Sequence, residues 1–190
     1  MEFMTSFPAD EKVVVVGHSL GGLLISKAME TFPEKISVAV FLSAIMPGPN
    51  INTLNVIIPH LDNRITYDNG PTNPPTTVIL GPKFLAANVY HLSSIKDLAL
   101  ATTLVRPFYL YPLEDVAKEI VLSREKYGSV RRVFIVVAEN KGLKKDFQQL
   151  LIEKNPPDEV EEIEGSDHMT MMSNPQQLFT TLLGIANKYT

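Results

Sequence analysis

The stretch VVVVGHSLGG, which runs from Val13 to Gly22, decides the fold of this chain. Its four valines form a short apolar run that is typical of a buried strand in a parallel sheet. The run ends in the pattern G-x-S-x-G, with Ser19 at its centre. That pattern is typical of a nucleophile elbow, a sharp turn from strand to helix that exposes its serine for attack. A match occurs by chance in roughly one chain in twenty of this size, so the surrounding elements must support it.

Strands and helices alternate on both sides of a long insertion. The segment after the elbow, 21–31, has helical spacing and is followed by Pro33. Asn174 caps a last helix that has Pro175 in its first turn. This order of elements predicts one α/β domain over residues 1–190, with a parallel sheet flanked by helices, and with the elbow it predicts an α/β-hydrolase fold. The expected strands are 13–16, 37–43, 133–137 and 160–163, and a further helix is expected over 143–154.

The insertion spans about 47–128. Its first part is rich in proline and asparagine, and its second part contains a helix that Ser94 and Asp97 introduce as a capping box. A long, partly helical segment between two core strands is typical of a lid over a site. We therefore expect this insertion to cover the elbow.

Composition excludes several classes of protein. The 190 residues are 45% hydrophobic and 20% charged, as in a globular domain, and the net charge of −4 argues against a nucleic-acid partner. The absence of cysteine excludes a disulfide framework, thiolate metal sites and a cysteine nucleophile. The longest apolar run, 38–45, is too short to cross a membrane, and the first residues do not form a secretory signal. A cytoplasmic protein without membrane partners is the expectation.

Three residues occupy the places of a serine hydrolase triad, in the chain order nucleophile, acid, histidine. Ser19 lies on the elbow, and His168 lies after the last predicted strand, where the general base belongs. The acid is expected just past the strand 133–137, but that place holds Asn140. The backbone N–H of Leu20, directly after the nucleophile, is the expected oxyanion donor.

Other polar residues near these positions have simpler interpretations. His18 is expected to be structural, and Asp167 is a poor orienting partner because neighbouring side chains on a loop diverge. Glu139 and Asp146 could act as the acid only after a rearrangement of the loop. The remaining candidates are ordinary polar residues (His60, His91), a solvated helix start (Lys141, Lys144, Lys145) and methionines of the core or the substrate pocket (Met169, Met171, Met172).

Several segments together resemble the plant methylesterase family. They are GHSLGG, VAVFLSAIMP, GPKFLA, DLALATTLVRP, YGSVRRVFIV and GSDHMTMM, which follow in this order along the whole chain. The resemblance implies an α/β-hydrolase that cleaves small methyl esters, such as those of salicylate, jasmonate or indole-acetate, without metal or cofactor. It also implies Ser19 as nucleophile and His168 as base. The related hydroxynitrile lyases are a weaker match, since they carry lysine where this chain has Met169.

Two departures from that family predict impaired chemistry. The family has aspartate at the position of Asn140, and its front section of roughly sixty residues, with a loop that supplies half of the oxyanion hole, is expected to be missing here. We therefore expect ester hydrolysis to be weak or absent. The alternative is a non-catalytic remnant that binds a small ester or its acid. Because the elbow strand then becomes a sheet edge, aggregation or a homodimer through this edge is also expected.

Overall fold

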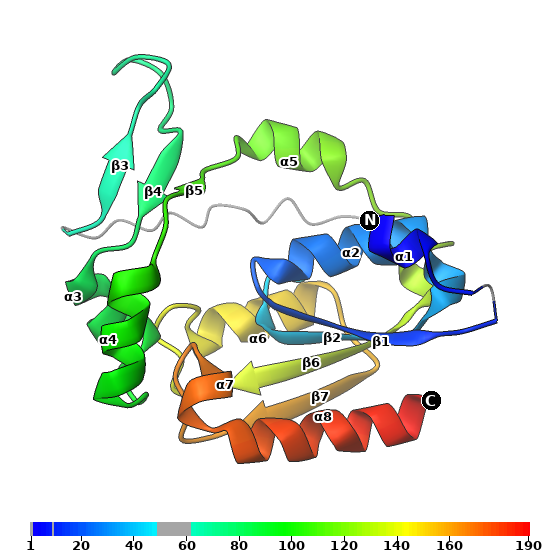
Figure 1. Cartoon of the computed structure of the whole chain (residues 1–190). Helices are drawn as coiled ribbons and strands as arrows, with labels where there is room; N and C mark the ends of the chain where they lie inside the picture. The colour runs from blue at the N-terminus through cyan, green and yellow to red at the C-terminus, as the bar shows by residue number, and fades with distance from the viewer. Residues whose placement is uncertain (1, 9, 49–61) are drawn as a thin grey trace.

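The framework of the protein is a four-stranded parallel sheet (Figure 1). A computed structural model describes residues 2–8, 10–48 and 62–190. The strands lie in the order β1-β2-β6-β7, and each is parallel to its neighbours, so all four carboxyl ends meet at one edge. Their bounds are β1 Val13–Ser19, β2 Ile36–Ala44, β6 Arg131–Val137 and β7 Glu159–Ile163.

Helices cover both faces of this sheet (Figure 1), as the sequence predicts. Alternate residues of β2 point to opposite sides. Phe41 packs in a core with residues of α2 (Gly21–Thr31) and α6 (Lys145–Lys154). Leu42 packs in a second core with α8 (Pro175–Tyr189). The predicted parallel sheet with flanking helices is therefore confirmed.

Several predicted boundaries were wrong by one to three residues, since β2, β6 and β7 also begin one or two residues earlier than predicted. The first strand does not end at Val16 but continues through Ser19, because it keeps pairing with β2 up to the elbow. The helix predicted from Leu143 begins at Lys145 instead. The N–H of Leu143 donates to the Asn140 side chain, which keeps this residue in the turn before α6.

The insertion contains a small antiparallel sheet that the sequence analysis did not predict. Its other elements are helical, and Ser94 caps α4 through the N–H of Asp97, as predicted. Residues 49–61, which include His60 and part of the proline- and asparagine-rich region, lie outside the described residues. The elements of the insertion are β3 Arg64–Thr66, β4 Thr77–Ile79, α3 Pro82–Phe84, a π-helical turn over Leu85–Val89, α4 Ile95–Leu104, β5 Phe108–Tyr109 and α5 Leu113–Glu119.

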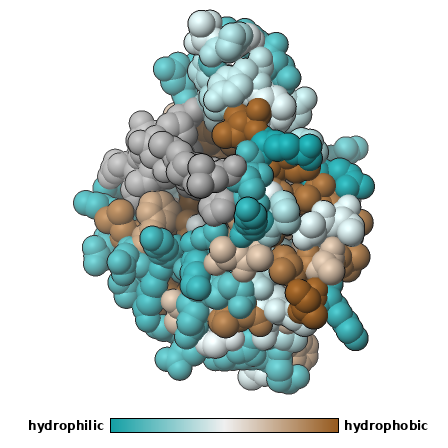
Figure 2. Space-filling view, turned by 90° about the vertical axis from the view of Figure 1, so that its left-hand side faces the viewer, coloured by the Kyte–Doolittle hydropathy of each residue, from teal (hydrophilic) through white to brown (hydrophobic). Residues whose placement is uncertain are grey.

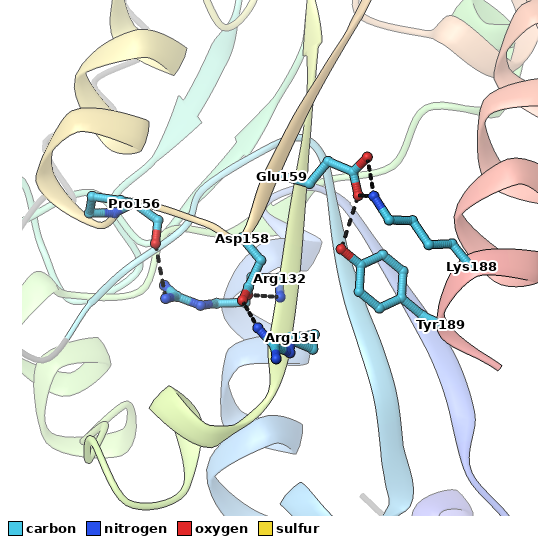
Figure 3. Close-up of polar contacts among 7 residues, drawn as sticks. All are labelled: Arg131, Arg132, Pro156, Asp158, Glu159, Lys188 and Tyr189. Carbon is cyan, nitrogen blue, oxygen red and sulfur yellow. Dashed lines mark hydrogen bonds and ion pairs between the residues drawn. The ribbon is translucent and has the colours of Figure 1, made fainter.

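Ion pairs join the elements at the amino-terminal end of the sheet (Figure 3). Asp158 accepts from Arg131 and from the backbone of Arg132, and Glu159 accepts from Lys188 and Tyr189. This polar end lies opposite the edge where the elbow is found. The remaining short elements are α1 Glu2–Thr5, α7 Thr170–Ser173 and 3-10 turns at Pro33–Lys35 and Tyr127–Ser129. Within the described ranges, no helix has the length and apolar character needed to cross a bilayer.

Candidate active site

The elbow is as tight as its sequence predicts. Ser19 has a φ of 56°, a left-handed conformation that a residue other than glycine rarely adopts. A Cβ atom on Gly17 would lie 2.8 Å from the carbonyl oxygen of Gly21, and one on Gly22 would lie 1.9 Å from that of Ile45. Only glycine fits at these two positions, so the strand can pass directly into α2 beneath the serine.

The structure brings the three predicted side chains together at the carboxyl edge of the sheet. His168 follows β7, and its Nε2 lies 3.1 Å from the Oγ of Ser19. Asn140 follows β6, and its Nδ2 lies 2.9 Å from the Nδ1 of His168. His168 is therefore held between a hydroxyl on one side and an amide on the other.

The direction of the Asn140 amide fixes the tautomer of His168. The backbone N–H of Leu143 approaches Asn140 to 2.9 Å, and because a backbone N–H can only donate, the oxygen of the amide must lie there. The NH₂ group then faces the Nδ1 of His168 and the Oγ of Ser43, 2.6 Å away. An amide NH₂ also only donates, so Nδ1 carries the lone pair. The ring proton is on Nε2 and points towards Ser19.

His168 stays neutral across the physiological range. Burial is the main cause that lowers the pKa of His168 to about 3; the nearby His18 contributes in the same direction, and the charge of Asp167 opposes both. Burial also lowers the pKa of His18, whose Nε2 lies 2.7 Å from the carbonyl oxygen of His168. Since a carbonyl oxygen accepts, this His18 nitrogen carries its proton and fixes the backbone of His168. This contact agrees with the structural role expected for His18.

The acidic residues near His168 have partners elsewhere. Asp167 is fully buried, and its carboxylate accepts the N–H groups of Leu92, Ser93 and Met169. It therefore anchors the chain before α4 to the loop that carries His168. Glu139 accepts the N–H of Ser166, and Asp146 is exposed in the first turn of α6. Among the described residues, no group of three histidine, aspartate or glutamate side chains could hold a metal ion.

A cavity of about 1630 Å³ lies over this edge of the sheet, and Ser19 and His168 line it. Met169 and Met172 line it too, whereas Met171 packs against the core beside α8. Figure 2 views the side that carries α3, α4 and the small sheet, and it shows apolar patches set among polar residues. The insertion supplies much of the apolar wall: Leu80, Phe84, Leu85, Leu100, Leu104, Val105, Phe108, Val116 and Ile120.

Ser43, which contacts Asn140 from the end of β2, was not predicted as a site residue from the sequence. Its only signal in the sequence is that Ser43 ends a predicted strand and interrupts the apolar run over 38–45. The cavity-lining residues of the insertion also carry no chemical motif, and only the folded chain shows which of them face the site.

Comparison with known proteins identifies the family to which this chain belongs. A model of the alpha/beta hydrolase family matches residues 2–181. Methyl jasmonate esterase 1 of Vitis vinifera is 51% identical over 198 residues, which cover 100% of this chain and 76% of that protein. The chain belongs to the plant methylesterase family of α/β-hydrolases.

Solved structures of methylesterase-family proteins share the fold. A crystal structure of polyneuridine aldehyde esterase is 43% identical with a TM-score of 0.88, and covers 98% of this chain and 76% of that one. Tomato methylketone synthase I complexed with 2-tridecanone is 70% identical with a TM-score of 0.94. A variant of the same enzyme complexed with β-ketoheptanoate is also 70% identical, with a TM-score of 0.95. Both cover 100% of this chain and 76% of theirs.

Proposed function

We propose that this protein decarboxylates β-keto acids to methyl ketones, and that its hydrolysis of methyl esters is weak or absent. One observation carries the proposal: the NH₂ group of Asn140 faces Nδ1 of His168, which leaves the ring proton on Nε2, beside Ser19 at the edge of the cavity. This arrangement offers a hydrogen-bond donor where an esterase needs a base.

Ester hydrolysis needs the opposite tautomer. The base must receive the Ser19 proton through a lone pair on Nε2, while Nδ1–H donates to a carboxylate. Asn140 donates to Nδ1 instead and brings no negative charge to stabilise an imidazolium. In a serine protease, asparagine in place of the triad aspartate lowers kcat by about 10⁴. The Asn140 contact therefore argues against efficient hydrolysis, as the sequence already suggested.

Decarboxylation of a β-keto acid suits a neutral donor. The bond between the α-carbon and the carboxylate breaks, CO₂ leaves, and the electron pair forms an enolate with its charge on the ketone oxygen. One proton from solvent then adds to the α-carbon and gives the methyl ketone. A preorganised N–H stabilises the developing enolate oxygen, and a neutral imidazole can serve as that donor. We assign this role to His168 Nε2–H, and we assign the N–H of Leu20 as a second donor.

The relatives support this substrate class. Loss of CO₂ from a β-keto acid gives a methyl ketone, and the structures of tomato methylketone synthase I hold one molecule of each kind, β-ketoheptanoate and 2-tridecanone. That enzyme shares 70% identity with this chain, against 51% for methyl jasmonate esterase 1. The apolar cavity has room for a straight alkyl chain beside Ser19 and His168. The proposed substrates are therefore medium-chain β-keto acids.

Methyl ester hydrolysis is the second candidate. Ser19 is on a formed elbow with its Oγ 3.1 Å from His168, and curated relatives carry esterase names. It requires that His168 change its tautomer during the reaction, with Asn140 rotated to accept from Nδ1. The third candidate, binding without catalysis, needs only the cavity.

Parallel assays distinguish these candidates. The purified protein is incubated with β-ketomyristate, and 2-tridecanone is measured against the spontaneous background, while methyl jasmonate and methyl salicylate are tested for hydrolysis. We expect ketone formation that falls about 10²–10³-fold in His168→Ala, as for the loss of one oxyanion donor. Ser19→Ala, the matched control in the same site, is expected to stay within about threefold, because no step uses the hydroxyl as nucleophile.

Two outcomes would overturn the proposal. Ester hydrolysis that depends on Ser19 and exceeds ketone formation would favour the esterase. Saturable binding of 2-tridecanone with neither reaction above background would favour a binding protein.

A further inference from the structure

Ser43 is the extra residue of a β-bulge opposite the elbow. In the pairing of β1 with β2, His18 lies opposite Leu42 and Ser19 lies opposite Ala44, which leaves Ser43 without a counterpart. Its φ is 39°, so its backbone is in the left-handed region that favours glycine. Bulges and strained residues of this kind gather beside active sites, where they redirect a side chain.

The bulge directs the Ser43 hydroxyl to Asn140. The Oγ of Ser43 accepts from the Nδ2 of Asn140 at 2.6 Å, and the Ser43 side chain is fully buried. Asn140 is 3% exposed, so water does not offer it an alternative partner. With this bond, both hydrogens of the NH₂ group are paired, one with Ser43 and one with His168, while the oxygen pairs with Leu143.

We propose that Ser43 is a positioning residue that acts through Asn140 to keep the proton of His168 on Nε2. The inference rests on the proposed function for its effect on rate, but the tautomer itself is independent of the reaction. Leu143 determines which end of the amide faces His168, and Ser43 prevents the amide plane from turning. Without the hydroxyl, one buried N–H of Asn140 loses its acceptor. The amide can then rotate away from Nδ1 of His168 towards a different acceptor.

A double-mutant cycle tests whether Ser43 acts through Asn140. Ser43→Ala is expected to lower kcat for β-ketomyristate about tenfold, the effect of one buried hydrogen bond, with KM within about twofold. Asn140→Ala is expected to lower kcat at least as much. The double variant should match Asn140→Ala alone, since Ser43 then has nothing to position. Independent, additive losses, or an unchanged kcat in Ser43→Ala, would overturn the proposal.

Two further variants separate positioning from stability. Ser26 is another fully buried serine, and its Oγ donates to the carbonyl of Gly22 inside α2. Ser26→Ala removes a buried serine hydroxyl that does not contact Asn140, so it should leave kcat unchanged. Ser43→Gly removes the hydroxyl but relieves the left-handed strain, so it should lower kcat as Ser43→Ala does, with a smaller loss of stability. A Ser43→Gly variant with full kcat would show that the hydroxyl is not needed.

The tautomer gives a readout that does not depend on catalysis. In the ¹⁵N NMR spectrum of labelled protein, His168 should be protonated on Nε2 alone, and Ser43→Ala should add a population protonated on Nδ1. If this change occurs in a protein that forms no ketone, the role of Ser43 stands and the proposed function fails. If ketone forms but Ser43→Ala leaves the tautomer and kcat unchanged, the role of Ser43 fails alone.

Discussion

The parallel sheet and the insertion differ in both burial and chemistry. The sheet strands β2 and β6 are almost wholly buried, and the chain at their ends carries Ser43 and Asn140 beside Ser19 and His168. The insertion lines the same cavity largely with apolar side chains, and several of them, such as Leu100 and Leu104, are more than half exposed. The sheet therefore positions Ser19, Asn140 and His168, and the insertion supplies much of the wall of the cavity above them.

The largest contrast is expected in stability. Phe134 of β6 is fully buried, and Phe134→Ala should lower the free energy of unfolding by about 3–5 kcal/mol through lost burial and a cavity. Tyr109 of β5 is 69% exposed, and Tyr109→Ala should change it by about 0.5 kcal/mol or less. Urea denaturation measures both. Equal losses would show that the insertion is as much a part of the cooperative core as the sheet.

The second contrast concerns the edge of the sheet. Asn140→Asp replaces the NH₂ donor by an acceptor, so Nδ1 of His168 must carry the proton and Nε2 loses it. Ketone formation should fall about 10²–10³-fold, as for a lost oxyanion donor, and the ratio of ester hydrolysis to decarboxylation should rise. Side-by-side kcat values for β-ketomyristate and methyl jasmonate test this. An Asn140→Asp variant with unchanged decarboxylation would remove His168 Nε2–H from the mechanism.

The same division explains what the sequence could and could not predict. Apolar β-branched runs and helical spacing place β2, β6, α2 and α8, because burial on both sides of a parallel sheet leaves a continuous pattern. The elbow motif and chain order place Ser19, Asn140 and His168 in contact. Chain order does not reveal a bulge, so Ser43 has no visible role until β1 and β2 are paired.

The insertion was less predictable for a physical reason. Its sheet consists of strands of two or three residues, too short for an alternating pattern to stand out. Which of its apolar residues face the cavity depends on how α4 and α5 dock. The tautomer of His168 also could not be predicted from the sequence. It depends on the N–H of Leu143, which orients the Asn140 amide, and every residue except proline has such a backbone group.

A smaller effect is expected from the cavity wall. Leu104→Ala removes apolar surface that would contact an alkyl chain, so KM for β-ketomyristate should rise up to about tenfold while kcat stays constant. Ile95 lies on the same helix and is 76% exposed outside the cavity lining, so Ile95→Ala is the matched control. Steady-state kinetics measure both variants. A fall in kcat without a change in KM in Leu104→Ala would place this helix in the chemistry instead.

The smallest expected effect is that of pH. Because burial lowers the pKa of His168 to about 3, the imidazole gains a second proton only near that pH, far below the usual 6.5. Its N–H donor is thus unchanged from pH 5 to 8, and kcat for decarboxylation should vary less than about twofold over this range. An esterase base with an ordinary pKa would lose activity below pH 6.5. A sigmoidal fall of kcat centred near 6.5 would show that His168 titrates normally.

The central claim is that His168 is a neutral donor with its proton on Nε2, and ring ¹⁵N NMR of the selectively labelled protein tests it most directly. Asn140→Asp, recorded in parallel, supplies the spectrum of the opposite tautomer. We predict that one-bond coupling to hydrogen is found on Nε2, that Nδ1 has none, and that neither signal moves between pH 5 and 8. A proton on Nδ1 in the unmodified protein, or a titration near pH 6.5, would contradict the account.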